Sequence, residues 1–167
     1  MHYYIDGYNW LFQTVKPSTA FEGKRRDFIE AISMLTKDLS ADVTIVFDSS
    51  DPTRDLYTRS HFQDIEIIYT PKGQTADAYI EDAVALKAAL GPVAVVTLDR
   101  NLQDKCRALG ATILTMKAFY SLCAKKKDKK IKKSAAPAAA ESPQQIARLM
   151  KIFEERLSQR PKEEPSP

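Results

Sequence analysis

The chain is poor in the residues that cross-link small domains or bind zinc in them: its 167 residues include 2 cysteines and 2 histidines. Cys106 and Cys123 lie in helix-like stretches without the spacing of a metal site, and only His2 and His61 could add to them. We therefore expect reduced, partly buried thiols in a cytoplasmic protein and no zinc centre.

Long apolar runs and glycine-rich loops are also missing. No run approaches the roughly 18 apolar residues that a membrane helix needs. The N-terminus has no basic segment followed by an apolar one, so we expect no signal peptide and no membrane partner. Neither a G-x-G-x-x-G nor a Walker loop occurs. These absences, with no second acid two residues after Asp6, argue against a small-molecule enzyme such as a phosphatase.

The net charge of +3 conceals two regions of opposite sign. Residues 1–123 hold 13 Lys and Arg against 16 Asp and Glu, a net charge of −3, whereas residues 124–167 hold 12 against 6, a net charge of +6. Such an asymmetry suggests a nucleic-acid partner for the basic part. It also suggests, less directly, that the acidic part gathers carboxylates around a cation.

Short apolar strands alternate with amphipathic helices through the acidic part. Strands are predicted at residues 3–5, 42–47, 65–69, 93–98 and 112–114, and helices at 21–39, 76–90, about 101–109 and 116–123. Residues 53–64 show no clear period. This order predicts an α/β domain with a mostly parallel central sheet between two helical layers.

The remaining residues divide by composition. We expect a domain over residues 1–123, a basic run and flexible linker over 124–142, an amphipathic helix over 143–160 and a disordered tail over 161–167.

Acidic residues recur where these elements meet. Asp6, Asp48 and Asp99 each follow a predicted strand, and Asp77 opens the helix after the strand at 65–69. Glu81 lies one turn beyond Asp77 on the same helical face. In an open parallel sheet, the carboxyl ends of the strands lie along one edge, where ligands collect. We therefore expect the acids to converge there.

Converging carboxylates repel one another, and a hard divalent cation relieves that repulsion. Mg²⁺ and Mn²⁺ favour carboxylate oxygens and water, and such a cation can activate water and offset charge on a phosphodiester. The sequence therefore predicts an Mg²⁺ or Mn²⁺ site.

Each acid also has a purely local explanation. Asp6 and Asn9 could form an Asx-type turn, and Asp48 could be a turn or cap residue. Asp77 could offset the dipole of its helix, and Asp99 could be the N-cap of the next helix. Convergence on one edge is what favours a shared site over four separate explanations.

Four segments, in order along residues 1–120, carry a distinctive combination of residues: Ile5-Asp6-Gly7-Tyr8-Asn9, Val46-Phe47-Asp48, residues 69–81 (YTPKGQTADAYIE) and residues 95–100 (VVTLDR). Together they resemble the NYN domain, a branch of the PIN-like ribonuclease superfamily, and most of all its bacterial YacP-like group.

The resemblance implies a metal-dependent endoribonuclease. Asp6, Asp77 and Asp99 would be metal-binding and catalytic acids, with Asp48 and Glu81 as further members of the cluster. Asn9 would orient a carboxylate, a water or a phosphate, and Thr97 would hydrogen-bond a water held by the metal. The sequence departs from the family pattern at Leu98, where a small or polar residue is usual. A non-catalytic RNA- or ribosome-binding module of the same fold is the alternative that Leu98 supports.

The expected partner is RNA, whether mRNA, tRNA or rRNA, alone or on the ribosome. Lys72, Arg100 and the lysines of KKKDKKIKK are candidate phosphate contacts, and that run includes Lys125, Lys126, Lys127, Lys129 and Lys130. The run could equally be a solvated, solubilising segment. Tyr8 and Trp10 could stack on bases, although core packing is the commoner role of aromatic residues.

Overall fold

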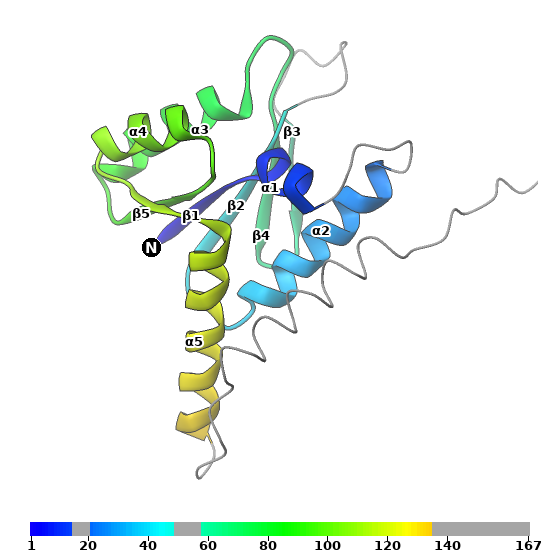
Figure 1. Ribbon diagram of the computed structural model, residues 1–167, viewed down its shortest axis with the longest axis vertical. Coiled ribbons are helices and arrows are strands. Elements are labelled where there is room, and N and C mark those ends of the chain that lie inside the picture. Colours follow the sequence, from blue (N-terminus) through cyan, green and yellow to red (C-terminus); the bar gives the residue numbers. More distant parts are fainter. Residues whose placement is uncertain (15–20, 49–57, 135–167) are drawn as a thin grey trace, which may run out of the picture.

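The computed structural model describes residues 1–14, 21–48 and 58–134. Within them, six strands form one sheet in the order β3-β4-β2-β1-β5-β6 (Figure 1). The strands are β1 (His2–Asp6), β2 (Asp42–Phe47), β3 (Thr58–Phe62), β4 (Ile65–Tyr69), β5 (Val93–Val96) and β6 (Thr112–Leu114). Every neighbouring pair is parallel except β3 with β4.

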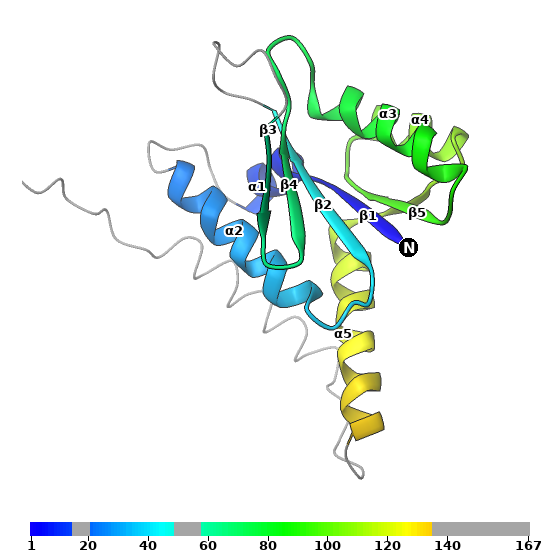
Figure 2. The same ribbon diagram turned by 180° about the vertical axis from the view of Figure 1, so that it is seen from behind.

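Helices cover both faces of the sheet, as Figures 1 and 2 show from opposite sides. Side chains of α1 (Gly7–Thr14), α2 (Phe21–Thr36) and α5 (Met116–Ser134) pack into one core. Side chains of α3 (Ala76–Ala88) and α4 (Arg100–Ala108) pack into the other. The predicted three-layer α/β/α architecture with a mostly parallel sheet is confirmed.

The alternation of side chains along a strand decides which face each functional residue meets. Tyr3 and Ile5 belong to the core under α2 and α5, whereas Tyr4 belongs to the core under α3 and α4. By the same alternation, Asp6 is directed to the α3–α4 side. Asp48 and Thr97 follow Val46 and Val95 of that same core in the same way. The strand period therefore directs all three polar residues to one face.

Three elements differ from the sequence expectations. Residues 7–14 form α1 in place of the predicted turn and loop. The unassigned residues 58–62 form β3, an exposed edge strand whose polar side chains hide its strand character. Helix α5 begins at Met116, as predicted, but continues past Cys123 to Ser134 because lysine is a good helix former.

The structure also bears on the expectations for the cysteines, for membrane helices and for the C-terminal residues. Cys106 and Cys123 are free and buried, and burial raises the pKa of the two thiols to about 11 and about 12. None of the helices in the described segments has the length and apolarity that crossing a bilayer requires. The helix predicted at 143–160 and the tail at 161–167 lie outside the described residues.

Candidate active site

Asp6 is a buried carboxylate at the carboxyl end of the central strand β1, with 5% of its surface exposed. Its Oδ1 accepts the backbone N–H of Asn9 at 3.2 Å, and its Oδ2 accepts the hydroxyl of Thr97 at 3.2 Å. The first contact is a helix N-cap interaction, because α1 starts at the next residue. The turn predicted from Asp6 and Asn9 is therefore the first turn of a helix.

The loop after β5 is fixed to Asp6 and to α1 by side-chain hydrogen bonds. Thr97 is 1% exposed, and its Oγ1 also accepts the backbone N–H of Asp99 at 3.0 Å. The Oδ1 of Asn9 accepts the backbone N–H of Leu98 at 3.0 Å. Leu98 is 40% exposed, so its side chain is not packed among the acids. Although Leu98 departs from the family pattern, hydrogen bonds to Asn9 and Thr97 still hold the backbone at Leu98 and Asp99.

Asp48 and Asp99 each hold the N-terminus of a helix. Asp48 Oδ1 accepts the backbone N–H of Ala76, the first residue of α3, at 2.6 Å. Thr75 caps the same helix by accepting the N–H of Ala78 at 3.1 Å. Asp99 caps α4 by accepting the N–H of Leu102 at 3.0 Å. The local explanations for Asp48 and Asp99 are thus correct, and capping occupies only one oxygen of each in these contacts.

The charges of neighbouring acids contribute to the raised pKa of two of these carboxyl groups. Burial raises the pKa of Asp6 from 3.8 to about 6, and the charges of Asp77 and, more weakly, Asp48 add to this effect. The hydrogen bonds from Asn9 and Thr97 act in the opposite direction but are weaker in sum. Burial, then the charges of Asp99 and Asp48, raise the pKa of Asp77. Each raised pKa reports a carboxylate that a positive charge would stabilise.

Glu81 lies at the border of this group and already has a partner. Its carboxylate accepts from Lys105 Nζ of α4 at 2.8 Å, and this hydrogen bond raises the pKa of Lys105. Within the described residues, no three acidic, histidine or cysteine side chains are spaced to hold one metal ion. Asp6, Asp48, Asp77 and Asp99 thus contribute to one another's electrostatic environment, but among the described residues they do not form a preformed metal site.

The N-termini of α1, α3 and α4 meet at this same edge, because each helix follows or faces one of these acids. Helix N-termini carry partial positive charge and unpaired N–H groups, which favour anions such as phosphate. The edge therefore combines carboxylates suited to a cation with backbone groups suited to a phosphate.

The predicted nucleic-acid contacts have varied environments. Lys72, in the turn after β4, and Arg100, the first residue of α4, are exposed. The lysines at 125–127 are exposed on α5, whereas the side chains of Lys129 and Lys130 lie outside the described part of the chain. Thr97 is directed to Asp6 and Asp99 rather than to solvent.

The two aromatic residues after Asp6 have separate roles. Trp10 is 6% exposed and packs edge-on against Phe28 and Phe119, so the core-packing alternative is correct for it. Tyr8 is half-buried, and its hydroxyl accepts from Arg25 at 3.4 Å. The Arg25 contact has no signal in the sequence, where Arg25 is simply a polar position on an amphipathic helix.

The family model of the YacP-like NYN domain matches residues 3–164. The chain belongs to this family, a PIN-like nuclease-type domain. The match extends beyond residues 1–120, on which the sequence resemblance rests, into the basic C-terminal region.

Solved structures agree with this assignment. Rae1 (YacP) from Bacillus subtilis is 20% identical with a TM-score of 0.57, and the alignment covers 95% of this chain and 91% of that one. A tryptophan-to-leucine mutant of Rae1 is 19% identical with a TM-score of 0.58, covering 94% and 97%. At such identities the likeness is one of fold. No curated protein matches the chain.

Proposed function

We propose that this protein is an Mg²⁺- or Mn²⁺-dependent endoribonuclease that hydrolyses phosphodiester bonds at the acidic edge of the sheet. The observation that carries the proposal is the pair Asp6 and Asp77. Both carboxyl groups have a raised pKa, and neither forms an ion pair among the described residues. A nuclease-type family and an acidic site that needs positive charge support the same chemistry.

The side chains fit a hard divalent cation in their chemistry. Carboxylate oxygens are preferred ligands of Mg²⁺, and Mg²⁺ usually keeps several waters, so direct contact with three acids is not required. Asp6, Asp77 and Asp99 would hold the cation, with Asp48 and Glu81 beyond them. When bound, it would supply charge stabilisation to the phosphodiester and acidify water.

The chain's own residues would orient the reactants. Asn9 and Thr97 hold the carboxylate of Asp6 from two sides, which fixes its direction toward the site. The N-termini of α1, α3 and α4 would attract the phosphate. Burial of Asp6 excludes water, which strengthens each electrostatic interaction there.

A cleavage assay with the purified full chain tests the proposal. We expect cleavage of single-stranded RNA with Mn²⁺ or Mg²⁺ and none with EDTA. Asp6→Asn and Asp77→Asn should each lower the rate by about 100-fold or more, the scale on which catalytic acids and bases act.

Asp104→Asn is the matched control, because Asp104 is an exposed acid of α4 that pairs only with Arg107 in the described contacts. Its cleavage rate should equal that of the unmodified chain. Full activity of Asp6→Asn, or activity that survives EDTA, would contradict the proposal.

The alternative function is an RNA- or ribosome-binding module without catalysis. The observation that favours it is the absence of three suitably spaced ligands among the described residues. Binding of Mn²⁺, followed by electron paramagnetic resonance, separates the two. RNA binding with neither Mn²⁺ binding nor cleavage would support the alternative.

A further inference from the structure

One peptide group beside the acidic edge has both of its polar atoms held by side-chain amides. The carbonyl oxygen of Thr97 accepts from Gln103 Nε2 at 2.9 Å, and the N–H of Leu98 donates to Asn9 Oδ1 at 3.0 Å. Asn9 lies in the first turn of α1, and Gln103 lies in α4. Because a peptide group is planar, contacts at both of its ends fix the direction of the whole plane.

The orientation of this peptide decides the path of the chain between two of the acids. The hydroxyl of Thr97 donates to Asp6 Oδ2 at 3.2 Å and accepts the N–H of Asp99 at 3.0 Å. Rotation of the peptide would change ψ of Thr97 and φ of Leu98, and with them the position of the Asp99 N–H. The contact between Thr97 and Asp99 therefore depends on a peptide that Gln103 holds.

Gln103 contacts this loop at two points. Besides its side-chain contact, its backbone N–H donates to the carbonyl of Asp99 at 3.0 Å. Thr97 is 1% exposed, and its own N–H donates to the carbonyl of Leu114 at 3.3 Å. A buried carbonyl that loses its donor is left unsatisfied, which favours rotation of the peptide toward another donor or toward water. Loss of the Gln103 amide would therefore weaken the hold on the loop between Thr97 and Asp99.

We propose that Gln103 is a positioning residue of the acidic edge. Together with Asn9, it holds the Thr97–Leu98 peptide in the orientation that keeps the hydroxyl of Thr97 in contact with the two acids. It acts through this peptide rather than on the RNA. Its effect on cleavage rests on the proposed nuclease function, whereas its hold on the peptide does not.

Amide hydrogen exchange, followed by NMR on the full chain in EDTA without RNA, tests the hold on the peptide. Gln103→Met removes the amide, and methionine has nearly the same length and a similar helix propensity. We expect the N–H groups of Leu98 and Asp99 to exchange about fivefold to tenfold faster in this variant, the scale of one lost hydrogen bond. Unchanged exchange at both residues in the folded variant would overturn the proposal.

Cleavage kinetics with Mn²⁺ test the consequence for the reaction. Gln103→Met should lower kcat by roughly 10- to 100-fold, the range that a small misplacement of reacting groups costs. KM should be unchanged, because the residue acts through the loop. Gln103→His should recover most of kcat at about pH 8, where a neutral imidazole can donate from Nε2 to the same carbonyl. A kcat of Gln103→Met equal to that of the unmodified chain would contradict the positioning role.

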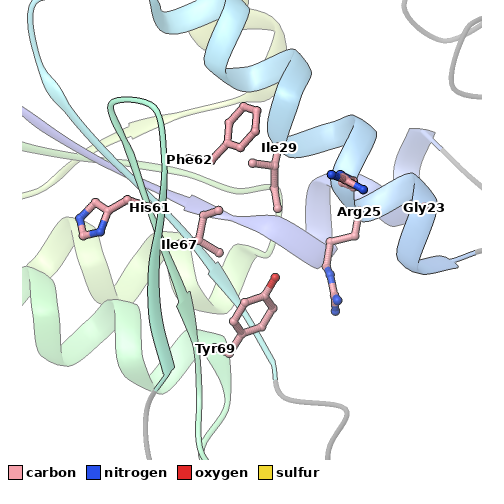
Figure 3. A pocket seen from close by; sticks show the side chains of 8 residues that line it. Gly23, Arg25, Ile29, His61, Phe62, Ile67 and Tyr69 are labelled. Atoms are coloured by element: carbon pink, nitrogen blue, oxygen red, sulfur yellow. The ribbon is translucent and has the colours of Figure 1, made fainter.

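Two control variants separate positioning from general effects on the fold. Asp104→Met places the same side chain at an exposed position of α4. Ile29→Val removes one methylene from the core on the α2 side of the sheet, where Ile29 lies with Phe62 and Ile67 at a pocket of about 420 Å³ between α2 and the β3–β4 hairpin (Figure 3). Both controls should keep the kcat of the unmodified chain and its exchange at the loop. A loss of kcat in Ile29→Val as large as that in Gln103→Met would assign the effect to stability and overturn the proposal.

The nuclease proposal fails separately from this one. If the unmodified chain does not cleave RNA, the exchange measurement alone decides whether Gln103 holds the peptide. If the unmodified chain cleaves RNA and exchange at Leu98 and Asp99 is unchanged in Gln103→Met, the positioning proposal fails and the nuclease proposal stands.

Discussion

At the scale of single residues, the most informative group is the Asp6 carboxyl. Its burial and its acidic neighbours oppose ionisation more strongly than the Asn9 and Thr97 hydrogen bonds favour it, so its pKa is about 6 rather than 3.8. A group with a raised folded-state pKa binds more protons when folded than when unfolded between the two values. Asp6 therefore destabilises the metal-free fold as the pH rises from about 4 to about 6.

We predict that Asp6→Asn stabilises the metal-free protein at pH 7.5 by on the order of 2 kcal/mol, because asparagine keeps an acceptor for Asn9 without the charge. Near pH 4 the two proteins should be equally stable, since Asp6 is then mostly protonated. Urea unfolding in EDTA across pH 4–8 measures this difference. Burial also lowers the pKa of His2, but that contribution is the same in both proteins and cancels.

The substitution Asp104→Asn, at an exposed residue, serves as the control. Its free energy of unfolding should equal that of the unmodified chain at every pH. A destabilised Asp6→Asn at pH 7.5 would show that the contacts of the carboxylate outweigh its burial, which would contradict the raised pKa of Asp6.

At the scale of elements, the first residue of α1, Gly7, packs directly against the ring of Phe47 in β2. A Cβ at Gly7 would lie 2.4 Å from the Phe47 ring, too close for any side chain. Helix α1 follows β1 without a loop, and the backbone N–H of Asn9 donates to Asp6. Glycine is therefore needed at this position for packing and not for an unusual backbone angle.

Gly7→Ala should lower the free energy of unfolding by about 1–3 kcal/mol, the usual effect of overpacking a well-filled core. Phe47→Leu in the same chain should recover part of that loss, because it removes the ring that clashes. Chemical denaturation of the two single variants and the double variant gives the coupling energy. Gly23→Ala, where the Cβ has open space, is the control and should be neutral or stabilising.

Independent, additive effects of the Gly7 and Phe47 substitutions would mean that the ring moves aside without loss. Packing against Phe47 would then not require glycine at position 7.

At the scale of the whole molecule, the two signs of charge occupy different places. The carboxylates lie at the edge where β1 and β5 end, whereas the lysines at 125–127 are exposed on α5, which runs away from the sheet (Figure 1). A basic helix placed in this way suits contact with RNA phosphates beyond the site.

Replacing Lys125, Lys126 and Lys127 together by glutamine should reduce the salt slope of RNA binding by up to about 2, at about 0.7 per phosphate contact. Folding should be unaffected, because glutamine and lysine have similar helix propensities. Binding titrations from 50 to 300 mM salt, chosen as roughly the range in which phosphate contacts weaken, measure the slope, with Lys117→Gln as the single-charge control. An unchanged slope would favour the solvated, solubilising role for this run.

Local features of this fold could be predicted from the sequence alone. The buried strands, the N-caps Thr75 and Asp99, and the placement of Asp6, Asp48 and Asp77 at element ends are local features, so they follow from residue type and spacing. Helix α1 was missed because Gly7 and Asn9 are common turn formers, and strand β3 was missed because its strand character depends on pairing with β4.

The sequence by itself determined the layered fold, the family pattern and the candidate acids, because period, caps and turn residues act over a few neighbouring positions. Tertiary structure alone decided that Glu81 pairs with Lys105 and that α2 and the β3–β4 hairpin enclose a pocket. It also decided that Trp10 is buried, whereas the hydroxyl of Tyr8 accepts a hydrogen bond from Arg25. The physical reason is that these contacts join residues from different elements, and only the packing of those elements sets their distances.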